Sequence, residues 1–294
     1  MADDVPSPLA RREGLLALGA LVLGALAMGI SPTFVRFADV GPFTSAFWRV
    51  FLALPALYAW MRWAERGDAA KSGVSRATWL AGLSFTGDLL FWHLSILSTS
   101  IANATFFATT APIWVIAFGW LLFRARASAR VLAGLALCIA GGAALLARSL
   151  QLKTGGAIGD LEGMATGVFF GLYFLAVQAA RRGAGAARVT FQSSLITAAL
   201  LFVVAAVVER HLWPHSLGGV AALLAMAWIS HAGGQGLLAV ALCKLPASFS
   251  SLVIFLEAIA AAAFGYLFVG EPVAAVQALG GVLILAGIYV ARPR

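Results

Sequence analysis

The stretch AFGWL at residues 117–121 returns 146 positions later as AFGYL at residues 263–267. The same offset brings Gly134 onto Gly280 with no gap, so the similarity extends beyond the motif itself. Internal sequence similarity at one long, fixed spacing indicates that a structural unit has been duplicated. We therefore interpret the chain as two copies of one unit.

The composition shows what kind of unit is repeated. Hydrophobic residues make up 62% of the 294 residues, charged residues make up 11%, and the mean hydropathy is +0.94, whereas a soluble domain has roughly 25% charged residues. Such a chain is typical of membrane proteins, in which each crossing takes about 20 apolar residues. We predict ten membrane-spanning helices, at residues 15–35, 43–63, 77–97, 103–123, 130–147, 159–180, 189–208, 219–241, 247–268 and 273–291.

Ten helices shared between two copies leave five helices in each copy. Because five is odd, the second copy enters the membrane from the opposite side, which predicts an all-α integral membrane protein with two inverted five-helix repeats. Such repeats are typical of transporters, since two similar, oppositely oriented halves stabilise inward-open and outward-open states comparably. We expect a cytoplasmic tail at residues 1–14, the first repeat at 15–148, an extracytoplasmic connection at 149–158 and the second repeat at 159–294.

The distribution of positive charge predicts the orientation. The net charge is +8, and if the helices alternate in direction, most of the 20 Lys and Arg residues fall on the side of the N-terminus. The positive-inside rule then places both termini in the cytoplasm. It also explains the basic composition without a nucleic acid partner. Arg49 belongs to neither side, since it lies inside the second predicted helix.

The N-terminus has an alternative interpretation as a cleavable signal peptide. Arg11 and Arg12 precede an apolar stretch that contains the small residue Ala25, which is the general pattern of such a signal. The repeat argues against cleavage because the first copy needs this helix. The two cysteines, Cys138 and Cys243, lack the spacing of a metal site or a disulfide framework, so we predict neither.

Two groups of residues indicate structural roles. Glycines in the fifth and tenth predicted helices indicate that these helices pack closely; they are Gly134, Gly141, Gly142, Gly280, Gly281 and Gly287. Tryptophans near the ends of the spans are typical of anchors at the membrane–water interface; they are Trp48, Trp60, Trp63, Trp79 and Trp213.

Three longer stretches resemble a known family. FWRVFLALP at 47–55 has a basic residue in the second helix, ATTAPIWVIAFGWLLFRARAS at 108–128 is a proline-bearing fourth helix with a basic turn, and GEPVAAVQALGGVLILAGIYVA at 270–291 closes the chain. On these stretches the chain resembles the drug/metabolite transporter superfamily, specifically its ten-helix exporters with two EamA-type repeats. The first repeat departs from the pattern, because residues 124–128 stand where the second repeat has Gly-Glu-Pro at 270–272.

Within that superfamily the chain looks most like the aromatic amino acid exporters of bacterial inner membranes. The resemblance covers essentially the whole chain and implies a location in the bacterial inner (cytoplasmic) membrane. It also implies a central cavity walled by helices 1, 3, 4, 6, 8 and 9. We expect a transporter rather than an enzyme, with no cofactor and no metal.

Three ionisable residues, Asp88, His231 and Glu257, lie near the middle of predicted helices. A charge at that depth is costly, so such groups face a cavity, pair with another group or stay neutral. For each acid, a neutral carboxyl bonded to a neighbouring helix is the alternative to a role in transport. Asp88 could also pair with Arg49, whereas we expect no cation at comparable depth for Glu257. His231 either lines a cavity or packs in the core.

Helical spacing extends these positions to a candidate cavity lining, because residues three and four apart share a helix face. Phe85, Asp88 and Trp92 share a face of the third helix, and the repeat offset places His231 and Gln235 on the equivalent face of the eighth. An amino acid needs partners for both its charges and an apolar wall for its side chain. The predicted substrate-binding residues are Met28, Ser31, Phe85, Asp88, Trp92, Thr110, Trp114, Tyr173, His231, Gln235, Ser251 and Glu257.

We predict an exporter of amino acids, including aromatic and other apolar ones, that works by alternating access as a monomer or homodimer in contact with membrane lipid. An exporter of drugs or other small metabolites is the alternative within the superfamily. A membrane enzyme is disfavoured because no cluster of His, Asp and Glu stands at an interface, so no catalytic residue is predicted. A non-transporting scaffold is disfavoured because polar residues occupy the middle of the spans.

Overall fold

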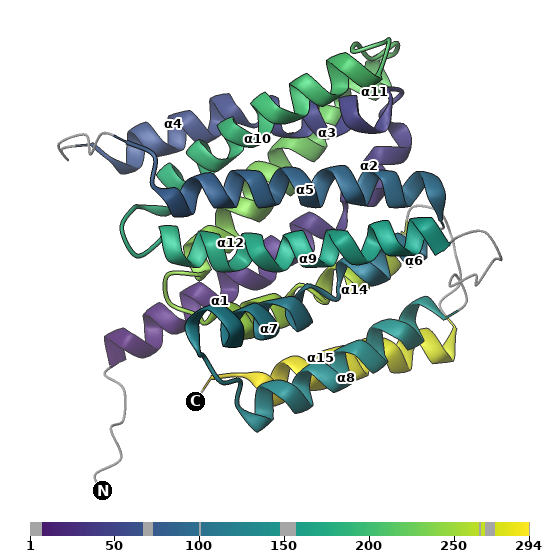
Figure 1. The fold of residues 1–294 in the computed structure, drawn as a ribbon. Coiled ribbons are helices and arrows are strands. Elements are labelled where there is room, and N and C mark those ends of the chain that lie inside the picture. The colour runs from purple at the N-terminus through teal and green to yellow at the C-terminus, as the bar shows by residue number, and fades with distance from the viewer. Residues whose placement is uncertain are drawn as a thin grey trace, which may run out of the picture.

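The computed structural model describes residues 8–66, 73–99, 101–147, 157–264, 266–267 and 274–293, and within these ranges it contains helices and no strand. The helices form one bundle, and the chain enters α1 and leaves α15 at the same end of it (Figure 1). This confirms the all-α class. The helices are α1 (Pro8–Gly29), α2 (Ser31–Phe37), α3 (Pro42–Phe51), α4 (Leu54–Ala64), α5 (Arg76–Ser98), α6 (Ile101–Ala108), α7 (Ala111–Phe123), α8 (Ala129–Leu146), α9 (Ala157–Ala180), α10 (Ala186–Val208), α11 (Leu217–Ala225), the π-helix η1 (Met226–Gln235), α12 (Gly236–Ala241), α13 (Ala247–Val253), α14 (Leu256–Phe264) and α15 (Ala275–Ala291).

Half of the ten predicted spans are interrupted in the structure. Prolines account for three of the interruptions, because proline has no N–H to donate and its ring clashes with the preceding turn. Pro32, Pro55 and Pro112 each stand in the first turn of the second piece, in α2, α4 and α7. The eighth predicted span contains the π-helix η1, and the ninth is divided between α13 and α14.

Helix length and composition support a membrane location. Seven helical stretches in the described residues are long and apolar enough to cross a membrane, and the apolar helices α8 and α15 are shorter. The interruption before Pro55 leaves α3 with 10 residues and α4 with 11. The total of ten crossings therefore stays a prediction of the sequence.

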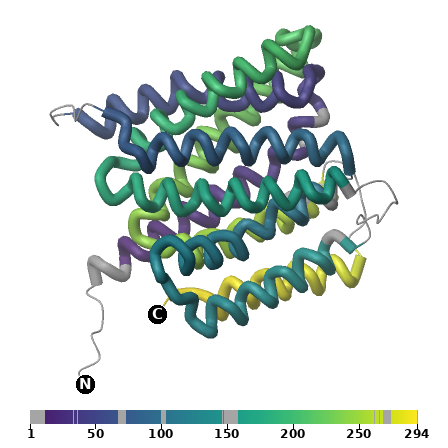
Figure 2. Tube along the Cα trace, in the orientation of Figure 1, coloured from purple at the N-terminus to yellow at the C-terminus, as the bar shows by residue number. Residues whose placement is uncertain are grey.

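Helices α8 and α15 lie side by side at one edge of the bundle (Figures 1 and 2), and glycines bring their backbones together. A Cβ on Gly141 would lie 2.6 Å from the Gly280 carbonyl oxygen, and a Cβ on Gly287 would lie 2.6 Å from that of Gly134. Close packing is thus confirmed for four of the six predicted glycines. The offset of 146 converts the contact Gly134–Gly287 into Gly280–Gly141.

Other helix pairs are related in the same way. Helix α5 packs along α9, and their equivalents by the repeat offset are the stretch containing η1 and α12, and α1. These equivalents also pack together, since α1 contacts both η1 and α12. The two pairs meet around a cavity in the middle of the bundle.

Candidate functional site

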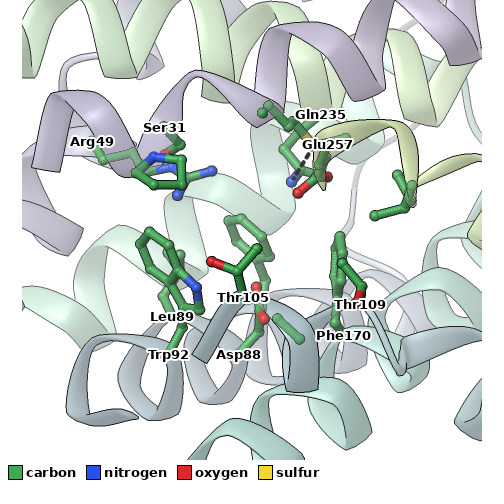
Figure 3. Close-up of a pocket in the computed structure, with 16 residues that line it drawn as sticks. Ser31, Arg49, Asp88, Leu89, Trp92, Thr105, Thr109, Phe170, Gln235 and Glu257 are labelled. Carbon is green, nitrogen blue, oxygen red and sulfur yellow. Dashed lines mark hydrogen bonds between the residues drawn. The ribbon is translucent and has the colours of Figure 1, made fainter. Parts of the chain in front are cut away.

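The central cavity lies between the helices of these two pairs, together with α2, α3, α6 and the α13–α14 junction (Figure 3). Its volume is about 60 Å³. The lining combines charged, hydroxyl, amide and apolar side chains, and consists of Met28, Gly29, Ser31, Pro32, Arg49, Phe85, Asp88, Leu89, Trp92, Thr105, Ala108, Thr109, Phe170, Gln235, Ile254 and Glu257.

The interrupted helices point their irregular segments at this cavity. Gly29 ends α1, Thr109 lies between α6 and α7, Ile254 lies between α13 and α14, and Gln235 is the last residue of the π-helix. Irregular backbone at membrane depth is tolerated where it lines a cavity, and π-helical turns are frequent at functional sites. The irregular backbone segments therefore converge on the same cavity that the polar side chains line.

Three charged side chains, Arg49, Asp88 and Glu257, line this cavity. Arg49 is 6% exposed and Asp88 is 8% exposed, yet no ion pair within 4.0 Å joins Arg49 to either acid in the described structure. Arg49 Nη2 instead donates to Ser230 Oγ at 3.2 Å. The Asp88–Arg49 ion pair considered from the sequence is therefore not formed here.

The expectation that Glu257 has no cation nearby is wrong. Arg49 lines the same small cavity as Asp88 and Glu257. In Figure 3, Arg49 and Ser31 lie along one side of the cavity with Gln235 and Glu257 beyond them, and Asp88 faces them from the opposite side. One cation and two acids thus surround a single small space.

Several buried polar atoms around this space have no hydrogen-bond partner among the described protein atoms. Arg49 Nε is a donor, the Ser31 hydroxyl can donate or accept, and Gln235 Oε1 and Glu257 Oε1 are acceptors. A buried polar group left unpaired costs about 1–3 kcal/mol, so four such groups around one cavity call for a ligand or water that carries both acceptors and donors.

The rest of the lining is largely apolar. Phe85, Leu89, Trp92 and Phe170 contribute ring and aliphatic surface, and Phe85, Leu89 and Trp92 come from one face of α5. The His93 ring packs edge-on against the Trp92 indole, with the two ring centroids 4.9 Å apart. The cavity therefore places an apolar wall beside its charged groups.

Seven of the twelve residues predicted for the site line this cavity: Met28, Ser31, Phe85, Asp88, Trp92, Gln235 and Glu257. Tyr173 and His231 lie behind Phe85, with ring centroids 4.8 Å and 5.3 Å from its own. The Nε2 atom of His231 is 2.8 Å from the hydroxyl of Ser194. These two residues support the wall from behind.

The remaining three predicted residues also lie outside the cavity lining. Thr110 and Trp114 pack where glycines of α9 leave space, since a Cβ on Gly167 would lie 2.5 Å from Thr110 Oγ1 and 3.4 Å from Trp114 Nε1. Ser251 is fully buried and donates to the Ser248 carbonyl at 3.3 Å. The structure gives these three side chains packing contacts.

Sequence reasoning missed several lining residues, and two signals could have found some of them. Arg49 is a basic residue well inside the second predicted span, which by the cost of a charge at that depth already indicates function. The second signal is that Thr105 and Thr109, two polar residues one turn apart on the fourth predicted helix, share a helix face. Phe170 had no signal that distinguishes it from neighbouring phenylalanines.

Comparison with known proteins gives consistent results. The model of the EamA-like transporter family matches twice, at residues 15–147 and 157–292. An uncharacterised transporter of Archaeoglobus fulgidus is 27% identical over 276 residues, which cover 92% of this chain and 94% of that protein. A second uncharacterised transporter of the same organism is 35% identical over 130 residues, 43% of each chain. A crystal structure matches with a TM-score of 0.80 and 18% identity, covering 96% of this chain and 97% of that one, which shows a shared fold.

Proposed function

Since the chain belongs to the EamA-like transporter family and is a multi-pass membrane protein, we propose that it exports amino acids, aromatic and other apolar ones included, through the central cavity. The observation that carries this proposal is the set of unpaired donors and acceptors beside an aromatic wall. A zwitterion with an apolar side chain offers a carboxylate to the donors, an ammonium group to the acceptors and an apolar surface to the wall.

Each end of the substrate has a partner in the cavity. The carboxylate binds at Arg49 Nε and the Ser31 hydroxyl, because both can donate a hydrogen bond and neither has a protein partner among the described residues. The ammonium group binds between Glu257 and Asp88, with Gln235 Oε1 as a further acceptor. Charge-assisted hydrogen bonds of this kind are about twice as strong as neutral ones, so both ends contribute to recognition. The substrate side chain then packs against Trp92.

The same proposal includes two inverted five-helix repeats, at residues 15–148 and 159–294, with both termini in the cytoplasm of a bacterium. The double match of the family supports the repeats. The repeat offset converts the contact Gly134–Gly287 between α8 and α15 into the contact Gly280–Gly141, which supports a two-fold relation between the repeats. The common end of the bundle at which α1 begins and α15 ends supports an even number of crossings.

Alternating access is supported by a difference between the two ends of the bundle. A cavity of about 730 Å³ opens at the end with the termini, lined by residues that include Ala77, Ala180 and Ala184. The repeat offset relates these to Leu223, Phe34 and Ala38, which instead pack in one hydrophobic cluster at the other end. Equivalent positions thus line a cavity at one end and are packed together at the other, which is the difference that alternating access requires.

The central cavity must widen when substrate binds. Its volume of about 60 Å³ is far below the ~300–1,000 Å³ of ordinary ligand pockets. The interruptions between α1 and α2 and between α6 and α7 divide the walls into shorter pieces. Movement of these pieces would make room for a substrate that arrives from the open end.

Cysteine labelling in detergent tests which end is open. In a background with the exposed Cys243 replaced by serine, cysteine at Ala184 should react with a maleimide reagent, while cysteine at Ala38 should stay unlabelled. Ala184 lines the open cavity and Ala38 is 2% exposed. Because the offset of 146 makes these positions equivalent, each is the other's control. Equal labelling of both would contradict an open and a closed end.

Replacing Trp92 with alanine tests the aromatic wall. We expect transport of tryptophan and phenylalanine to fall about tenfold more than that of alanine, because burying a large apolar side chain contributes about 1.5–3 kcal/mol. Counterflow of labelled amino acids in proteoliposomes gives the measurement. Trp120→Ala is the matched control, since Trp120 is 55% exposed on α7. Equal losses for all substrates would make Trp92 a packing residue, and competition by organic cations but not by amino acids would favour a drug exporter.

A further inference from the structure

A second cavity lies away from the central one, in a groove between α3 and α10. Its volume is about 480 Å³, and its walls are apolar throughout. Phe51, Phe202 and Trp213 are 44%, 48% and 69% exposed, so the groove opens outward between helices rather than into the bundle. A membrane protein presents such a surface to lipid.

The groove is shaped by small residues beside large rings. Ala198 and Ala199 on α10 line it beside bulkier neighbours such as Leu195 and Phe202. The ring of Phe47 lies 5.3 Å from that of Phe202, and the ring of Trp48 lies 5.1 Å from that of Trp213. These two ring pairs and the alanines border a groove whose volume fits a narrow, flexible hydrocarbon.

The groove has little polar surface with which to recognise a ligand. The indole N–H of Trp48 donates to the Leu212 carbonyl at 2.6 Å, and the other side chains that line the groove are hydrocarbon apart from the Trp213 indole. Trp213 lies at the rim, where an indole N–H meets the headgroup region in membrane proteins. The occupant of the slot itself must therefore be apolar.

The charge at the rim indicates which headgroup accompanies that occupant. Glu209 accepts hydrogen bonds from the backbone N–H groups of Phe43 and Thr44 at 2.8 Å and 3.0 Å, so its charge is directed inward at the start of α3. Arg210, the next residue, is exposed. Basic residues at the membrane surface attract anionic lipid headgroups. Because Glu209 is held at the start of α3, the exposed charge in this segment is that of Arg210, two residues before Leu212, which lines the groove.

We propose that this groove binds an acyl chain of an anionic phospholipid in the leaflet opposite the chain termini, with the lipid phosphate near Arg210. The site is separate from the central cavity and does not depend on which substrate is exported. A second copy of the chain is the competing occupant. A narrow slot suits one acyl chain, whereas a stable interface between two protein copies buries about 800 Å² on each partner.

Native mass spectrometry of the purified protein with equimolar phosphatidylglycerol and phosphatidylcholine of matched chains tests the proposal. The unaltered protein should retain phosphatidylglycerol in preference, and Ala199→Phe, which fills the slot, should lower retention about tenfold because several methylene contacts are displaced. Val207→Phe is the matched control, because Val207 is 80% exposed on the same helix and does not line the groove. Arg210→Gln should remove the preference for the anionic lipid while keeping a bound chain.

Equal lipid retention by Ala199→Phe and Val207→Phe would overturn the proposal, as would the absence of a retained lipid from the unaltered protein. If the unaltered protein formed a lipid-free dimer and Ala199→Phe separated it into monomers, the groove would be assigned to a second copy of the chain. Phenylalanine counterflow by the same preparations reports separately on amino acid export, so failure of the lipid site and failure of the transport proposal are distinguishable.

Discussion

Replacing Arg49 with glutamine is expected to lower phenylalanine transport about 10- to 100-fold, because hydrogen bonds to a charged group contribute about 1.5–3 kcal/mol. Arg49 is buried, its Nε has no partner among the described protein atoms, and it lines the cavity together with Asp88 and Glu257. Loss of the carboxylate partner should raise KM in a proteoliposome counterflow assay.

A decarboxylated analogue separates binding from folding in this experiment. Phenethylamine keeps the ring and ammonium group of phenylalanine but lacks the carboxylate, so its binding should be nearly the same with and without Arg49→Gln. Arg76→Gln changes an exposed arginine at the start of α5 and should transport phenylalanine normally. Equal weakening for both ligands would show that Arg49 does not bind the carboxylate, and unchanged phenylalanine transport would remove it from the site.

Replacing Gly280 with leucine is expected to destabilise the protein by about 3 kcal/mol, since overpacking a tight contact forces backbone and side chains apart. A Cβ at this position would lie 2.5 Å from the Gly141 carbonyl oxygen and 2.5 Å from the Leu145 nitrogen. Neither backbone atom can move without shifting α8 away from α15. Thermal unfolding in detergent and the monodisperse yield on size exclusion report the effect.

The next residue along the helix provides a matched control. A Cβ added to Gly281 would meet no atom of a neighbouring helix within 4 Å in the described structure, so Gly281→Leu places its side chain in open space. It should also improve helix propensity by up to about 1 kcal/mol. Similar unfolding temperatures for the two variants would mean that the glycine contact contributes little to the stability of the fold.

The sequence by itself determined the all-α class and the close contact of the fifth and tenth predicted helices. Both inferences depend on properties that are local or repeated along the chain, namely the length of apolar runs and the recurrence of glycine at one offset. Helical spacing also identified the face of α5 that carries Phe85, Asp88 and Trp92, and all three line the cavity. That face could be predicted because α5 is uninterrupted from Arg76 to Ser98.

The tertiary structure alone decided how the other helices complete the site. On the fourth predicted helix, spacing from a continuous helix selected Thr110 and Trp114, whereas Thr105 and Thr109 line the cavity. The reason is that helical spacing shows which residues share a face but not which face meets the cavity, and Thr105 and Thr109 lie on a different face from Thr110 and Trp114. Arg49 shows the second limit. Its meeting with Asp88 and Glu257 depends on packing between residues far apart in sequence, which no periodicity within a single helix specifies.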